Sequence, residues 1–118
     1  MIEVRASIKN GQRLLSYNAW NKQMPIAVKG IGNEMNAFQL PPSIRVIIPT
    51  DADVTIDENT PVIKLYSVPE ISLKKALILS SGVQLVTETC KVHLIIQNMS
   101  ESLVTISDGD LLAHALTS

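Results

Sequence analysis

The chain has 118 residues, a net charge of −1 and a hydrophobic content of 46%, whereas charged residues make up only 18% of it. This length predicts a single domain, and a domain of this size buries only about two-thirds of the surface of its unfolded chain. The apolar content exceeds what one small core readily hides, so burial between subunits is expected. Scattered charges and an aromatic content of 3% argue against nucleic acid as a partner.

Membrane insertion and disulfide bonding are not expected either. The apolar runs fall far short of the roughly twenty residues that a membrane-spanning helix needs. Cys90 is the only cysteine, which excludes a disulfide within the chain. The N-terminus lacks the charged and apolar blocks of a secretory signal, and this favours a protein made in a reducing compartment.

Residues 1–43 are predicted to form an N-terminal strand followed by an irregular arm. Apolar and polar residues alternate over the first eight positions, and Asn10-Gly11 is a strong turn signal. Glycine, proline and asparagine then interrupt residues 17–43, which also carry large apolar groups: Trp20, Met24, Met35 and Phe38. Two interpretations are open, an arm whose four apolar side chains contact a partner and a loop that covers the domain's own core.

Residues 44–118 are predicted to form a β core. Its first part, to Tyr66, has the pattern of a β-hairpin, and Pro49 is expected to end the first strand because proline cannot donate to a ladder. The segment 68–81 fits either a helix or a short buried strand near 76–79, with a turn at Ser80-Ser81-Gly82. Another strand is predicted at 83–86.

Three more strands are predicted in the last 28 residues. Val92, Leu94 and Ile96 alternate with polar residues, which is the period of a strand. A second strand is expected at 103–106. The third, at 111–116, is apolar on both faces and is therefore expected to be buried on both.

The turn between the last two strands has an earlier counterpart. Ser107-Asp108-Gly109-Asp110 aligns with Asp57-Glu58-Asn59-Thr60, so that Gly109 falls on Asn59. Glycine and asparagine are the residues that best tolerate positive φ, which a closely connected hairpin needs. The two segments are interpreted either as related hairpins or as two ordinary hairpins that look alike. The predicted fold class is therefore all-β, an antiparallel β-sandwich or small barrel.

No catalytic, cofactor or metal site is predicted. Cys90 and His93 lie three apart, which puts them on opposite faces of a strand, and His114 is expected to be a core or interface histidine. No nucleophile elbow or complete phosphate loop is present. Acidic residues gather near the first turn, where they are expected to be solvated.

Residues 94–116 resemble the C-terminal strands of the trimeric dUTPases, in which a strand ends in Asn and a later Gly-Asp-x-Ile-Ala-Gln begins another strand. The positions that match this pattern are Asn98, Ile106, Gly109, Asp110, Leu112, Ala113 and His114. His114 stands in place of the usual Gln and Leu111 in place of the usual Arg. The resemblance implies a dUTPase-like, β-clip-type fold that forms a homotrimer.

Departures from that family imply that catalysis is lost. Leu85, Glu88, Thr89 and Cys90 occupy the positions of the Asp that holds the attacking water, the Tyr that stacks on deoxyribose, and Arg-Gly. A leucine side chain neither orients water nor accepts a proton. The family's phosphate-binding Arg-Ser motif and its glycine-rich tail are not recognisable in this sequence.

Small phage head-decoration proteins use similar trimeric β-folds, so the resemblance implies a structural role without a cofactor. The expected protein is a trimeric virion component such as a capsid cement protein, with itself and the major capsid protein as partners. Its expected location is the virion if it is viral and the cytoplasm otherwise. Two alternatives stay open: a divergent nucleotide-binding relative that uses Asp51, Asp53 or Glu88 with magnesium, and an adaptor domain that binds a protein through residues 17–43.

Overall fold

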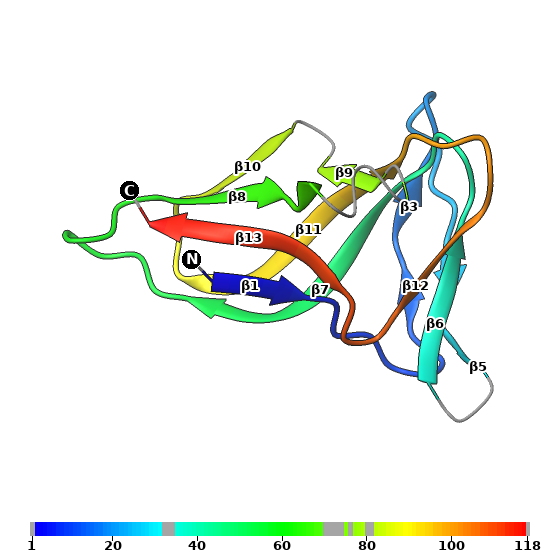
Figure 1. Cartoon of the computed structure of the whole chain (residues 1–118), viewed down its shortest axis with the longest axis horizontal. Coiled ribbons are helices and arrows are strands. Elements are labelled where there is room, and N and C mark those ends of the chain that lie inside the picture. Colours follow the sequence, from blue (N-terminus) through cyan, green and yellow to red (C-terminus); the bar gives the residue numbers. More distant parts are fainter. Residues whose placement is uncertain (1, 32–34, 70–74, 76, 80–81, 118) are drawn as a thin grey trace.

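The computed structural model describes residues 2–31, 35–69, 75, 77–79 and 82–117, and apart from helical Pro69 and Lys75 the elements that it places there are β-strands (Figure 1). In chain order they are β1 (Ile2–Arg5), β2 (Arg13–Leu14), β3 (Ser16–Tyr17), β4 (Ile26–Ala27), β5 (Lys29–Ile31), β6 (Met35–Leu40), β7 (Arg45–Val54), β8 (Ile63–Ser67), β9 (Leu77–Leu79), β10 (Val83–Val86), β11 (Cys90–Asn98), β12 (Val104–Ser107) and β13 (Leu111–Thr117). All pairs between these strands are antiparallel, which confirms the predicted class.

Two four-stranded sheets enclose the core. One has the order β1-β13-β8-β10 and the other β3-β7-β11-β9. The strand period places alternate residues on the inner face, so Ile48 and Leu94 of one sheet are buried in the same cluster as Leu65 and Ala115 of the other. The predicted alternation of β11 is confirmed, because Val92, Leu94 and Ile96 are all buried.

Hydrogen bonds join the two sheets along both sides. On one side Ala6, just after β1, forms a bridge with Thr50 of β7. On the other side the Gln84 carboxamide of β10 donates to the His93 carbonyl oxygen at 2.6 Å and accepts from the Ile95 amide at 3.1 Å. The Gln84 side chain thus donates one hydrogen bond to the β11 backbone and accepts one from it, as a peptide group of a neighbouring strand would. Because both sides are joined in this way, the sandwich resembles a nearly closed barrel.

A second group of strands lies at the right of Figure 1 and contains most of the segment predicted to be an irregular arm. Its sheets have the orders β12-β6-β5 and β2-β4. Phe38 of β6 pairs with Ile106 of β12 and is only 2% exposed. The expectation that Phe38 contacts a partner is therefore corrected: it belongs to the domain's own core.

Both predicted hairpins are wrong as pairings. β7 pairs with β3 and β11, whereas β8 pairs with β10 and β13. β12 likewise pairs with β6 and β13 with β1 and β8. Each turn instead carries the chain from one sheet to another, which a local strand–turn–strand pattern cannot distinguish from a hairpin.

Pro49 lies within β7 rather than at its end. It pairs with His93, and β11 shifts its register directly beyond that residue, between Lys91 and His93. The carbonyl oxygen of Pro49 still accepts a hydrogen bond from the Ser7 amide at 2.9 Å. The missing N–H is thus placed beside an irregular part of the ladder, where a proline is tolerated.

The two aligned turns use different chemistry. Gly109 has a φ of 86°, as predicted, and its amide donates to the Ala6 carbonyl oxygen at 2.8 Å. Asn59 is not among the described non-glycine residues with positive φ, so that part of the prediction is wrong. Its turn is instead held by Asp57 Oδ1, which accepts from the amides of Asn59 and Thr60.

The segment 68–81 is described only in part. The strand alternative is confirmed for Leu77–Leu79, which pairs with the end of β11, whereas Pro69 and Lys75 earlier in the segment are helical, as the other alternative expects. Gly82 has a φ of 80° and its amide donates to the Leu79 carbonyl oxygen, whereas Ser80 and Ser81 lie outside the described residues. The predicted strand at 83–86 is confirmed as β10.

Replacement of Gly109 by valine should lower the free energy of unfolding by about 1–2 kcal/mol, because a β-branched residue is strained at positive φ. Urea denaturation measures this loss. Gly30→Val is the matched control, since Gly30 lies in a strand, has no positive φ and has open space around an added Cβ. Equal stability of the two variants would contradict the assignment of this turn.

Candidate functional site

The outer face of the β1-β13-β8-β10 sheet carries an apolar surface, which we call the His114 face. Register places its side chains in two rows across three strands, and the first row continues on β1 with the exposed Glu3 opposite His114. The first row contains His114, Tyr66 and Val83, and the second contains Leu116, Lys64 and Leu85. Leu85 is 58% exposed, and Leu116 and Val83 are also exposed, so this face presents large apolar groups that the chain itself does not cover.

The His114 face qualifies the prediction for the last strand. Ala113 and Ala115 of β13 are buried against the core, and Leu112 is also buried on the opposite side of the strand. His114 is half-buried, however, and Leu116 is exposed. Burial on both faces therefore holds for the first part of β13 and is incomplete toward its end.

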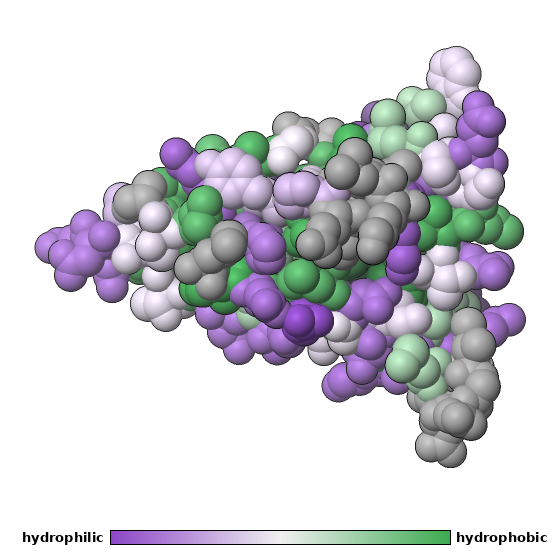
Figure 2. Space-filling view, viewed as in Figure 1, coloured by the Kyte–Doolittle hydropathy of each residue, from purple (hydrophilic) through white to green (hydrophobic). Residues whose placement is uncertain are grey.

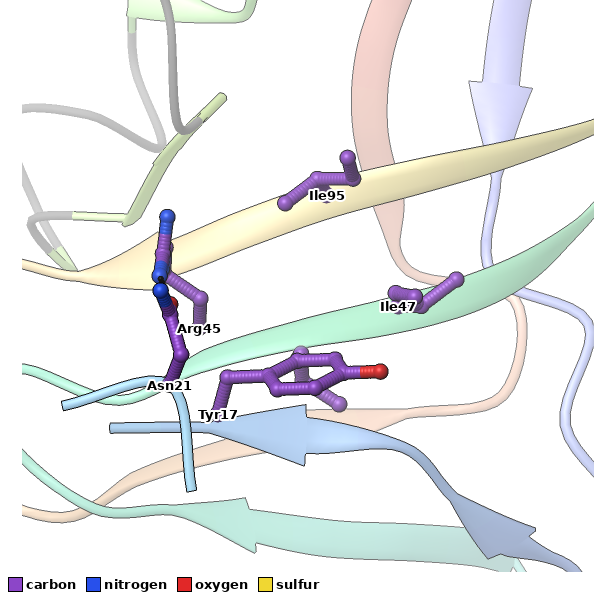
Figure 3. Close-up of a pocket in the computed structure, with 6 residues that line it drawn as sticks. Tyr17, Asn21, Arg45, Ile47 and Ile95 are labelled. Carbon is purple, nitrogen blue, oxygen red and sulfur yellow. Dashed lines mark hydrogen bonds between the residues drawn. The ribbon is translucent and has the colours of Figure 1, made fainter. Parts of the chain in front are cut away.

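A hollow of about 220 Å³ lies on the outer face of the other sheet (Figure 3). Ile47 and Ile95 are cross-strand partners at its floor, and Tyr17 of β3 lies beside them. At one end the Arg45 guanidinium donates to Asn21 Oδ1 at 2.8 Å. A second hollow, which shares Ile47, extends from there. We call the two together the Ile95 groove; the further lining residues are Gln12, Arg13, Leu14, Leu15, Val46, Pro49 and His93.

The segment predicted to be a partner-binding arm exposes three of its four large apolar groups. Trp20 is 82% exposed, and Met24 and Met35 are exposed as well. The turn that carries Trp20 is ordered by Asn18, whose Oδ1 accepts from the amides of Trp20 and Lys22. The exposed indole is thus presented on a hydrogen-bonded turn.

The structure brings no metal-binding constellation together in the part of the chain that it describes. Among these residues no group of three or more His, Cys, Asp or Glu side chains is placed so that it could hold a metal ion. Cys90 and His93 are both exposed on β11. Asp51 is used structurally, because its Oδ1 accepts from the Arg5 amide at 3.0 Å.

The positions aligned with the dUTPase substrate motif have other roles here. Leu85 projects from the His114 face, and Glu88 and Cys90 are exposed on either side of Thr89. Thr89 Oγ1 accepts from the Ile56 amide at 2.9 Å, which ties this turn to the end of β7. No carboxylate stands at the position of the family's water-orienting aspartate.

Asn98 is the residue of the dUTPase-like pattern that the structure explains best. Its side chain is fully buried, and the amide group donates to the carbonyl oxygens of Leu40 and Ser102, both at 2.8 Å. Its Oδ1 accepts from the amide and the hydroxyl of Ser100. All hydrogen-bonding capacity of the side chain is used within the chain, so Asn98 is structural and is not available to a ligand.

Sequence reasoning missed both apolar sheet faces and the closure by Gln84. The signal for the His114 face was present in β10, where Val83 and Leu85 alternate with Gln84 and Val86. That alternation identifies two faces but does not tell which one is inside. The polar side chain of Gln84 points toward β11, whereas the apolar side chains of Val83 and Leu85 point to solvent. Polar side chains of a strand usually face solvent and apolar ones the core, so these three residues show the opposite arrangement.

No known protein family matches the chain, and no curated protein is significantly similar to it. Within the described residues, no helix is long and apolar enough to cross a membrane.

Proposed function

We propose that this protein is a non-catalytic structural protein that assembles into a homotrimer. The observation that carries the proposal is the His114 face, where Val83, Leu85 and Leu116 lie exposed on a regular sheet beside half-buried His114 and Tyr66. Flat apolar surface of this kind is typical of contacts between subunits. A regular sheet also keeps the positions of its side chains fixed, so little conformational entropy is lost when a second subunit covers them.

The specific role that we propose is a decoration protein of a phage capsid, bound to the major capsid protein. Its support is the resemblance of residues 94–116 to trimeric dUTPases, combined with the similar trimeric folds of phage head-decoration proteins. Trp20, Met24 and Met35 would meet the capsid, because all three are exposed and lie outside the β1-β13-β8-β10 sheet that carries the His114 face. An exposed tryptophan is a common anchor of protein interfaces.

An adaptor domain that binds a different protein is the second candidate, and the same exposed Trp20 favours it. The two candidates differ in the partner and in self-association. A capsid protein is expected to be trimeric before it binds, whereas an adaptor has no need of a threefold assembly.

Lysine substitution of both Leu85 and Leu116 should dissociate the trimer, because two charges would be buried in an apolar contact. Size-exclusion chromatography should show a shift to the elution volume of the monomer. Leu103→Lys is the control, since Leu103 is as exposed as Leu85 but lies before β12, outside the His114 face. A double variant that elutes with the wild type would exclude this face from the contact.

Isothermal titration with dUTP and magnesium should give no heat, because no described group of His, Cys, Asp or Glu could hold the magnesium ion and Leu85 stands where the dUTPases have their water-orienting aspartate. A catalytic trimeric dUTPase is the positive control under the same conditions. Micromolar binding with turnover would instead support the nucleotide-binding alternative.

Virions purified from the source of this sequence should contain the chain in a fixed ratio to the major capsid protein. Quantitative mass spectrometry after density-gradient centrifugation measures that ratio. Absence of the chain from virions would overturn the decoration role. It would not affect the proposed homotrimer, which the chromatography of the lysine variants tests separately.

A further inference from the structure

A threefold ring needs two different patches on every subunit, because each contact joins one patch to a different patch of the neighbour. The His114 face supplies apolar surface for one of them. The two sides of an interface usually carry complementary electrostatic potentials. The charged residues of the subunit therefore indicate which two patches meet in the contact.

The Ile95 groove combines an apolar floor with cationic ends. Arg45 borders it at one end, and Arg13 borders the other hollow. The residues that line the two hollows include no aspartate or glutamate. Half-buried Arg45 keeps its guanidinium at the rim by its hydrogen bond to Asn21, so the charge is held in place for a partner.

Negatively charged side chains gather at one end of the folded molecule. Between Arg45 and Lys64 the sequence has four carboxylates and no basic residue. The turn after β7 projects at the left of Figure 1, and the same tip is hydrophilic in Figure 2. We call its exposed carboxylates, together with that of Glu88, the acidic end: Asp57, Glu58 and Glu88.

Glu88 belongs to this end because its neighbour Thr89 is hydrogen-bonded to Ile56. Asp53 is not counted, because register places Lys91 opposite it on β11. No ion pair between described residues neutralises the carboxylates of Glu58 or Glu88. The acidic end therefore keeps its charge available for a contact.

We propose that the acidic end of one subunit docks on the Ile95 groove of the next subunit in the ring, a contact that rests on the self-association proposed above. Glu88 follows β10 closely, so the exposed Leu85 lies near it and would bring the edge of the His114 face to the apolar floor of the groove. The carboxylates would then meet Arg45 and Arg13. Such a contact is head-to-tail and generates a closed ring when its rotation is a third of a turn.

Charge reversal on each side tests the contact. The groove variant combines Arg13→Glu with Arg45→Glu, and the acidic-end variant combines Glu58→Lys with Glu88→Lys. Asp57 is left unchanged because its carboxylate holds the turn. Lys9→Glu with Glu101→Lys is the control, since both side chains are exposed and line neither patch. Circular dichroism checks that each variant is folded.

Sedimentation velocity should show that each double variant raises the dissociation constant of the assembly by at least about tenfold, while the control does not. The four substitutions together should restore assembly, because each reversed charge again meets its opposite. Arg13→Glu alone should weaken assembly in the same direction. It serves as the second variant if loss of the Arg45–Asn21 hydrogen bond disturbs folding.

Three outcomes would overturn the docking proposal, and they separate it from the proposed function. A trimer that both double variants leave intact would remove the contact but keep the self-association. Double variants that dissociate without rescue by the combination would show that each patch meets something else, such as an acidic segment of another protein in the groove. A wild-type chain that is monomeric at every concentration would overturn both proposals.

Discussion

The buried carboxamide of Asn98 is the interaction on which the arrangement of the chain depends. It ends β11 in the two-sheet sandwich and binds the end of β6 and the loop before β12, which belong to the second group of strands. Its backbone adds two bonds, since Asn98 N donates to the Ile44 carbonyl oxygen and its own carbonyl oxygen accepts from the Ser43 amide. A side chain of another type would leave buried polar groups unpaired here, at a cost of about 1–3 kcal/mol for each.

Asn98 holds the two groups of strands together. Within the sandwich, only a few hydrogen bonds between described residues join the two sheets to each other. Ala6 and Thr50 join the sheets on one side and Gln84 joins them to β11 on the other. Because Gln84 turns inward to make this closure, its neighbours Val83 and Leu85 turn outward. The apolar His114 face is thus a consequence of how the sandwich is closed, and self-association is a way to cover it.

The sequence predicts the positions of strands and turns here better than it predicts which strands pair with one another. The period-2 pattern locates β11, and the need for positive φ locates the turn at Gly109, because both are properties of a few neighbouring residues. The pairing of β12 with β6 and of β13 with β1 depends on residues far apart in the chain, so local patterns wrongly predicted hairpins. Phe38 and the two outer faces show the same limit, since apolar character alone does not tell whether a side chain faces the core, a neighbour or solvent.

We expect this chain to cover its apolar sheet face with further copies of itself. Multi-angle light scattering over a series of concentrations measures the molar mass directly. The expected result is a stable species of about 39 kDa, three times the 12.9 kDa of one chain. A mass of 12.9 kDa throughout the series would contradict self-association and would mean that a different protein covers the His114 face.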